Sequence, residues 1–443
     1  MKKLIISLLI MIVLLSSCTP TGTEPEPKPS EETPAEPEPT PPEETPAEPE
    51  PNPTDEASGD KHFVVHSAPD KSPSTLEEVQ ALRIDKPLSD ETIQAIKNFM
   101  QASTPLLLSG EKNDNYSPLS LYLALAMAST GAEAESQAEI IQALQLENPD
   151  DLADQMGLIM ERLNVETSEG RIRLANSIWN QYNFPFEKDY IQTLNDKFQA
   201  SLFEVDFKSP EAGEQMSQWV SEKTEGLIQP EFDDTSDFIS VLFNALYFKE
   251  SWLAPFQAEL TKPDTFRGIE GESEKDFLHS SDKGMYISHE GVEGMILPFE
   301  YSRMILLKKS GSNPMDILKD YSLDDLTASA SLAMINLKLP KFEYSNEYNL
   351  KEMLEGLGMS KVFDPDEADF SGISPEPLFI SDILQDSFIS LDEDGVEAAA
   401  VTTIGFGTTS IIDKQVELAF DEPFLFVIES PEGLPLFVGT VTK

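Results

Sequence analysis

The chain has 443 residues, 40% of them hydrophobic, which is enough to bury a large core. Its 80 acidic residues far outnumber its 31 basic ones, and the net charge of −49 repels nucleic acids, anionic membrane surfaces and a heparin-like polyanionic cofactor. The only cysteine, Cys18, cannot form an internal disulfide.

The first 18 residues have the pattern of an export signal. Lys2 and Lys3 precede an apolar run, Leu4 to Leu15, that is too short to span a bilayer. The run ends in Leu-Ser-Ser-Cys, which resembles a bacterial lipobox, and that resemblance implies that Cys18 carries a lipid. We expect a protein anchored in the cell envelope outside the cytoplasm, with the membrane contacted only through the lipid; the alternative is an incidental thiol in a discarded signal.

Residues 19–60 form a Pro/Glu-rich segment with 13 acidic residues and one lysine, in which a nine-residue sequence occurs at 31–39 and again at 43–51. Such a composition buries little and favours an extended, disordered tether. We interpret 61–86 as a linker with some local structure, and 87–443 as one folded domain.

Two helices have clear start signals. Ser89 is a candidate cap for a helix with Ile93, Ile96 and Met100 on one face. Ser117-Pro118 combines a capping residue with proline at the first helical position. The helix that follows, at 119–129, is almost entirely apolar and should be buried.

Three apolar runs predict strands. The run at 238–248, rich in aromatic and β-branched residues, is best interpreted as a central strand, and 423–428 and 435–441 predict two more near the C-terminus. Helices and strands mix without regular alternation, and this favours an α+β fold.

The segment 393–410 begins like a turn and continues with small, uncharged residues. In a strand, Val396, Ala398, Ala400 and Thr402 would face the core, and Glu397 would lead the set that faces outward. Alanine and glycine form strands poorly, so the segment suits a loop that is exposed in one state and inserted into a sheet in another. The alternative from composition alone is an ordinary surface loop.

Several segments resemble serpins, in serpin order, from about residue 87 to the end. The matching segments are Asn113, Ser117–Ser120, 124–127, Gly131-Ala132, 175–179, 219–224, 244–249 with Trp252 and Phe256, 339–342, 357–359, 368–373, 423–426 and 435–439. The resemblance implies a fold with three β-sheets, eight or nine helices and an exposed reactive-centre loop that can insert into the central sheet.

The resemblance also assigns residues to sites. It implies a hinge made by Glu393, Gly395, Val396, Glu397, Ala398, Ala399, Ala400 and Thr402. It implies a polar "shutter" of Ser117, Ser120, Asn244 and Gln385 beneath the opening strands, and a "breach" at Trp252 where the loop first inserts. Asn244 as a satisfied core amide and Trp252 as simple core packing remain alternatives. Gln385 stands where many serpins carry histidine; an amide can still donate and accept, but it loses the pH response of an imidazole.

The family's action implies a single-use inhibitor. A serine protease, or a cysteine protease, would attack the loop and form an acyl-enzyme, and insertion of the cut loop would trap it as a covalent complex. Counting from Glu393 places the scissile bond at Thr409–Ser410; bonds after Thr408 or Ser410, or near Ile412, remain open. A small residue there favours an elastase-like or subtilisin-like target over a trypsin-like one.

Two other classes of function are alternatives. A non-inhibitory serpin-like surface binding protein would favour a charged or bulky hinge, which this chain lacks. A hydrolase would need a nucleophile or metal motif, and neither is present. The four histidines show no metal-ligand spacing. We therefore expect a monomer that is not an enzyme, with no metal and no cofactor.

Overall fold

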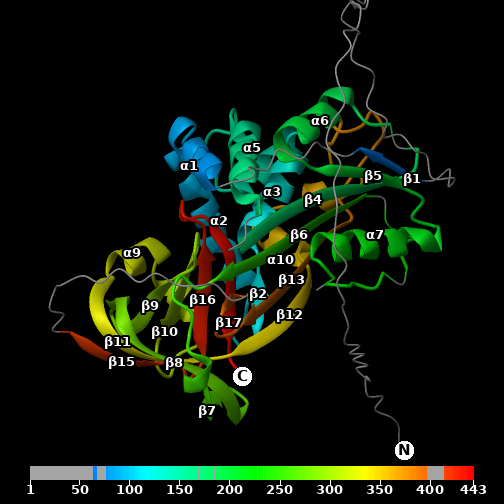
Figure 1. Ribbon diagram of the computed structural model, residues 1–443. Coiled ribbons are helices and arrows are strands. Elements are labelled where there is room, and N and C mark those ends of the chain that lie inside the picture. The colour runs from blue at the N-terminus through cyan, green and yellow to red at the C-terminus, as the bar shows by residue number, and fades with distance from the viewer. Residues whose placement is uncertain are drawn as a thin grey trace, which may run out of the picture. The chain divides into compact units, whose positions relative to one another are not determined.

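The fold is given by a computed structural model (Figure 1). It describes residues 63–66, 76–396 and 414–443, apart from 167–169, 184, 227, 233, 237 and 239, with the backbone alone at 63–66, 76–77, 165–166, 240 and 242–245. Contacts divide the chain into the units Met1–Ser58 and Gly59–Lys443, and every described residue belongs to the second. None of the helices in this part is long and apolar enough to cross a membrane. The predicted signal, tether and lipidation residue Cys18 lie outside the described residues.

The first sheet has eight strands with the predicted central strand, β6, in its middle. Its order is β1 (Phe63–His66), β5 (Ser201–Val205), β4 (Gly170–Gln181), β6 (Ser240–Ser251), β14 (Gly395–Val396), β13 (Asp382–Leu391) and β12 (Phe342–Asn349), with β3 (Val165–Glu166) beside β4. β6 confirms the strand predicted from the apolar run at 238–248.

The second sheet has nine strands. Its order is β15 (Gln415–Ala419), β11 (Ser331–Pro340), β8 (Gly271–His289), β9 (Val292–Pro298), β10 (Arg303–Lys308), β16 (Phe424–Glu429), β17 (Pro435–Val441) and β2 (Asp114–Tyr116), with β7 (Lys262–Gly268) beside β8. The resemblance implied three sheets. The described residues form two hydrogen-bonded sheets because β8 is 19 residues long and pairs with β7, β11 and β9 along its length.

Ten α-helices lie in the described residues, against the eight or nine implied. They are α1 (Leu76–Asp85), α2 (Asp90–Leu107), α3 (Pro118–Ser129), α4 (Ala134–Ala143), α5 (Leu152–Leu163), α6 (Lys188–Thr193), α7 (Pro210–Lys223), α8 (Asp316–Asp320), α9 (Leu323–Ala328) and α10 (Lys351–Gly356). α1 lies within 61–86, the segment that the sequence indicates is a linker with some local structure. Its Val79 is buried and its Arg83 forms a 2.6 Å ion pair with Glu432, so this helix packs on the domain.

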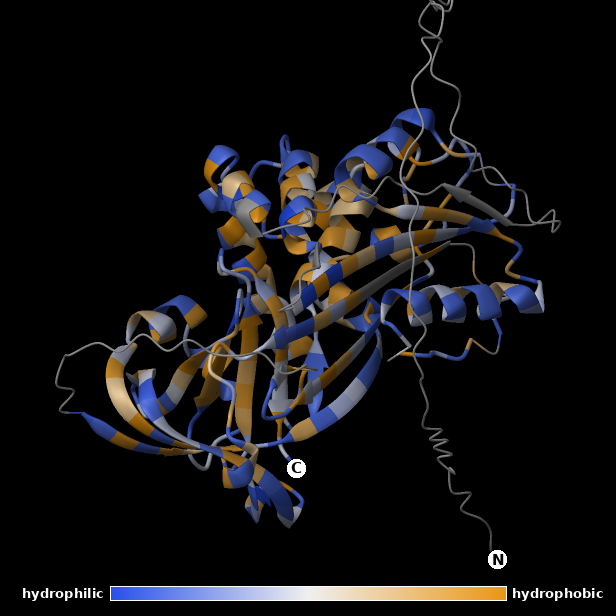
Figure 2. Cartoon of the chain, viewed as in Figure 1, coloured by the Kyte–Doolittle hydropathy of each residue, from blue (hydrophilic) through white to orange (hydrophobic). Residues whose placement is uncertain are grey.

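The helix signals correspond to observed caps. Ser89 Oγ accepts the backbone N–H of Thr92 at the start of α2, and Ser117 Oγ accepts that of Ser120 at the start of α3. All of α3 is buried because it packs against β4 and β6 on one side and β17 on the other. Figure 2 shows hydrophobic residues gathered on these facing surfaces, while α7 presents hydrophilic residues outward.

Candidate functional site

The first sheet is split between β6 and β13, and we call this split the slot. The two strands pair in parallel only from Asp382 to Asp386, opposite Val241 to Ala245. At the other end β14 lies between them, with Gly395 opposite Ser251 and Val396 opposite both Glu250 and Leu391. The start of the predicted hinge therefore already occupies the mouth of the slot.

The turn from Asp392 to Gly395 is held by backbone bonds to the segment after β6. Trp252 donates its backbone N–H to the carbonyl of Asp394 at 2.9 Å, and its indole N–H to that of Asp392 at 3.0 Å. The N–H of Phe256 donates to the carbonyl of Glu393 at 2.8 Å. These three bonds set the position of the hinge before it enters the sheet.

The side chain of Glu393 adds two further contacts. Its carboxylate lies 2.6 Å from Lys341 Nζ and accepts the hydroxyl of Thr261 at 2.7 Å. Partial burial opposes ionisation, but the hydrogen bonds from Lys341 and Thr261 outweigh it and hold the pKa of Glu393 below its ordinary value. The hinge thus begins at a charged, hydrogen-bonded anchor.

Gly395 and Val396 show why the hinge sequence is small. A Cβ on Gly395 would lie 2.1 Å from the carbonyl oxygen of Glu250 and 2.8 Å from the Cα of Ser251, so only glycine fits. The Val396 side chain is 2% exposed and belongs to the main core. Its inward orientation agrees with the predicted alternation, in which Val396 begins the core-facing set.

Trp252, to which the resemblance assigns the breach, lies beside the turn that leads into the mouth of the slot. Its ring stacks on Phe299 with centroids 4.4 Å apart and meets Phe256 edge-on at 5.9 Å. The indole therefore contributes both core packing and the hydrogen bond to Asp392.

Glu250 is a residue of this site that the sequence reasoning missed. It is fully buried beside Val396, and its carboxylate accepts the hydroxyl and N–H of Ser302 at 2.7 and 3.0 Å and the N–H of Tyr301 at 3.2 Å. Burial raises the pKa of Glu250 to about 7, although the bonds from Ser302 and Tyr301 oppose the rise. A glutamate at a core-facing position of an apolar strand was the available signal.

Three of the four residues assigned to the shutter, Ser117, Ser120 and Gln385, are joined by hydrogen bonds beside the paired part of the slot. Gln385 accepts the N–H of Ser117 at 2.9 Å and donates to its carbonyl at 3.0 Å, so the amide satisfies both backbone groups. Asn244 is directly opposite Gln385 in the strand register; its side chain lies outside the described residues. Ser120 is buried in the first turn of α3, where its N–H bonds to Ser117.

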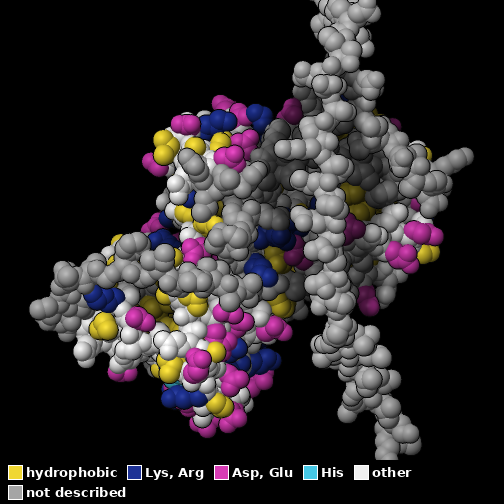
Figure 3. Space-filling model, viewed as in Figure 1, with side chains coloured by type: hydrophobic (Ala, Val, Ile, Leu, Met, Phe, Trp, Pro, Cys, Tyr) yellow, Lys and Arg dark blue, Asp and Glu magenta, His cyan; other side chains and the backbone are white. Residues whose placement is uncertain are grey.

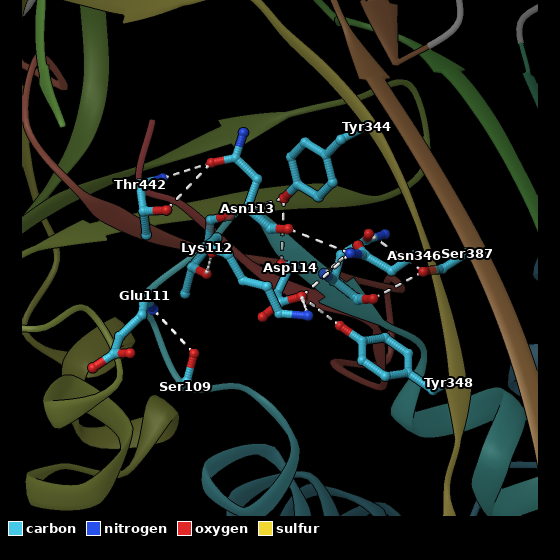
Figure 4. Close-up of polar contacts among 12 residues, drawn as sticks. Ser109, Glu111, Lys112, Asn113, Asp114, Tyr344, Asn346, Tyr348, Ser387 and Thr442 are labelled. Atoms are coloured by element: carbon cyan, nitrogen blue, oxygen red, sulfur yellow. Dashed lines mark hydrogen bonds and ion pairs between the residues drawn. The ribbon is translucent and has the colours of Figure 1, made fainter. Parts of the chain in front are cut away.

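A second polar cluster, also missed, ties β12 and β13 to β2 (Figure 4). Buried Asp114 accepts the hydroxyl of Tyr348 at 2.7 Å and the amide of Asn346 at 3.2 Å, and pairs with Lys112 at 3.0 Å. Ser387 donates to the carbonyl of Asn115 at 2.8 Å. One edge of the slot is therefore bonded to the second sheet, whereas β6 is not part of this cluster.

The remaining assigned residues lie outside the described part of the chain. They are the hinge residues Glu397, Ala398, Ala399, Ala400 and Thr402, and the bond Thr409–Ser410. Within the described residues, no three or more His, Cys, Asp or Glu side chains are placed to hold a metal ion.

Known proteins match this chain over most of its length. The family model for Serpin (serine protease inhibitor) matches residues 94–443. An uncharacterised serpin-like protein of Thermococcus kodakarensis is 30% identical, over 84% of this chain and 90% of its own. Leukocyte elastase inhibitor A of Mus musculus is 30% identical, over 74% of this chain and 92% of its own.

Solved structures agree with the sequence matches. The native state of the thermophilic serpin tengpin is 28% identical, covers 81% of this chain and 95% of its own, and superposes with a TM-score of 0.75. The latent state of the same protein, covering 81% and 99%, superposes with a TM-score of 0.70.

Proposed function

This chain belongs to the serpin family, and from that premise we propose that it inhibits serine proteases by acting as a suicide substrate. The observation that supports this most is the position of β14. The hinge residues Gly395 and Val396 lie in the mouth of a slot whose far end is closed by direct pairing of β6 and β13. Strand addition to a sheet, with release of stored strain, is the action of serpin loops.

The register of β14 specifies where further residues would go. If the register of β14 is continued along β6 and β13, Ala398 lies between Phe248 and Ile389, and Thr402 lies between Asn244 and Gln385. The registers to β6 and to β13 agree at every position, because Gln385 is itself opposite Asn244. Even-numbered residues then face the core and odd-numbered ones face outward, as Val396 does and as the sequence pattern predicts.

Insertion would carry a bound protease a long way. From Val396 to Thr409 the chain advances 13 residues, or about 40 Å as a strand. A protease joined to Thr409 as an acyl-enzyme would be pulled along this path and distorted before water completes hydrolysis. We propose Thr409–Ser410 as the scissile bond and an elastase-like or subtilisin-like enzyme as the target, which the likeness to a leukocyte elastase inhibitor supports. A cysteine protease is a further candidate, and the protein itself acts without catalysing a reaction.

We further propose that Cys18 is lipidated and that the acidic tether holds a monomeric inhibitor outside the cytoplasm. Labelled palmitate incorporated into the wild-type chain but not into Cys18→Ala would support the anchor.

The inhibitory function is tested by mixing the full chain with elastase, subtilisin, chymotrypsin and trypsin. An SDS-resistant complex and a released peptide beginning at Ser410 are expected. Cleavage by every protease without a complex would contradict inhibition of these enzymes and favour a non-inhibitory relative.

A further inference from the structure

Three basic residues lie together on the outer face of the first sheet, beside the mouth of the slot. Arg171 of β4 is directly opposite Lys249 of β6, and Arg173 follows two residues along β4 on the same face. We call Arg171, Arg173 and Lys249 the cationic cluster. Figure 3 shows Lys and Arg side chains gathered near the middle of the face over which β4 and β6 run. Such a cluster is notable in a chain of net charge −49.

The end of α7 supplies an anion to this cluster. Glu225, two residues past the helix, pairs with Arg171, and its carboxylate is 3.9 Å from Arg173. α7 itself covers the outer face of the sheet, since its Met216 and Trp219 pack in one cluster with residues of β4, β5 and β6. The ion pairs therefore hold the end of this helix over β4, the strand next to β6, which borders the slot.

The register of β14 directs a second carboxylate to the same place. Val396 is opposite Glu250 and faces the core, so the next residue, Glu397, would be opposite Lys249 and face outward if the chain continued into the slot. Its neighbour on the other side would be Ser390, whose hydroxyl is bonded to Glu343 at 3.1 Å. Across the strands the glutamate would meet basic side chains on one side and a small hydroxyl on the other.

We propose that the cationic cluster is the docking site for the Glu397 carboxylate, and that Glu397 displaces Glu225 from Arg171 as the loop inserts. This rests on the proposed insertion of the loop. Arg171 and Lys249 carry like charges directly opposite one another on paired strands, and such a pair is destabilising. The negative charge of Glu397 beside them would be stabilising. Entry of the first outward-facing hinge residue would therefore loosen the end of α7, the helix that covers the path of the residues behind it.

The test is a charge swap in the full chain. Lys249→Glu, Glu397→Lys and the double variant are nicked in the loop with a metalloprotease, which forms no acyl-enzyme and so cannot be trapped, and the rise in Tm that follows insertion is timed. Each single variant should slow insertion roughly threefold and lower the Tm of the cleaved form, and the double variant should recover most of both losses. Lys208→Glu, the same charge change at an exposed site between β5 and α7, is the matched control and should change neither.

Four results distinguish the outcomes. Additive losses in the double variant would overturn the proposal. An undiminished effect of Lys249→Glu in a Glu397→Gln background would also overturn it, and would point to another occupant such as the acidic tether. A wild-type chain that gains no thermal stability on cleavage would refute loop insertion itself, and with it the proposed function. Glu225→Gln should speed insertion about twofold and leave the cleaved form's Tm unchanged; slower insertion would contradict the displacement.

Discussion

The ammonium group of Lys341 lies 2.6 Å from Oε2 of Glu393, so the residue between β11 and β12 is joined by an ion pair to the residue at which the hinge begins. Both side chains are partly buried, with exposures of 34% and 17%. Lys341 immediately precedes β12, which pairs with β13, so this ion pair links the hinge to the β13 side of the slot.

Lys341→Ala should therefore loosen the hinge. Because the pair is partly solvent-screened, we expect a loss of about 1 kcal/mol in the stability of the native form. Because the pKa of Glu393 is lowered, its ionised carboxylate stabilises the native form fully above the ordinary pKa of 4.5. This stabilisation is lost as the pH falls through the lowered pKa. Thermal unfolding at pH 7 and pH 3 measures this. An equal effect of Lys341→Ala at both pH values would contradict it.

Glu250 predicts a pH dependence of the opposite sign. Its pKa is about 7 in the native protein and ordinarily 4.5, so the native state holds the proton more tightly than the unfolded chain. Its contribution to stability is complete below about pH 4.5 and is lost as the pH rises through 7, by an amount on the order of 3 kcal/mol. Burial also raises the pKa of Asp386 in β13 to about 7, with Glu347 nearby, and adds a loss of the same sign.

The measurement is the native-state Tm between pH 4.5 and 8 for the wild type, Glu250→Gln and Asp386→Asn. Each substitution should flatten the fall in stability toward high pH. Glu300→Gln is a control that removes a charge near Glu250. It should change the pH dependence of the Tm less, because Glu300 has the weakest influence on the pKa of Glu250. If the plot of Tm against pH for Glu250→Gln ran parallel to that of the wild type, the pH dependence could not be assigned to Glu250.

Gly395→Ala tests the close approach at the mouth of the slot. The added Cβ meets backbone atoms of Glu250 and Ser251, which cannot move as a flexible side chain could. We expect the native form to lose at least about 2 kcal/mol. Gly356→Ala in α10, where the new Cβ would meet only the Leu106 side chain at 3.3 Å, is the control. Equal stability of the two variants by denaturant unfolding would show that β14 does not enter the slot.

Gln385→Ala should be costly for a different reason. It would leave the buried N–H of Ser117 without its partner, at about 1–3 kcal/mol, while the carbonyl of Ser117 would keep the bond from the N–H of Leu121. Gln94→Ala, at an exposed position of α2, should cost far less. Gln385→His should retain most of the stability but make it pH-dependent between pH 5 and 7. A pH-independent His variant would mean that the imidazole does not occupy the place of the amide.

The sequence identified the parts of this site that depend on local signals. The caps at Ser89 and Ser117, the buried α3, the central strand β6 and the inward orientation of Val396 all follow from capping chemistry and side-chain alternation. An amide at position 385 can both donate and accept hydrogen bonds, and the side chain of Gln385 does both with the backbone of Ser117.

What the sequence could not supply depends on contacts between distant segments. Asp114 and Glu250 are buried charges whose partners, Tyr348 and Ser302, are far along the chain. The ion pair of Arg171 with Glu225 depends on where α7 crosses the sheet. The joining of β8 to three strands, which merges two expected sheets, likewise depends on the pairing of one long strand with three partners rather than on any local pattern.

The central claim is that the loop inserts between β6 and β13 in the register set by β14, and two adjacent alanines test it directly. Ala398→Arg would place a charge in the core between Phe248 and Ile389, whereas Ala399→Arg would point outward. The measurement is the ratio of SDS-resistant complex to cleaved product with a protease that the wild type traps. We predict that Ala398→Arg is cleaved at the same bond without forming a complex, and that Ala399→Arg still forms one. Equal complex formation by both variants would contradict insertion in this register.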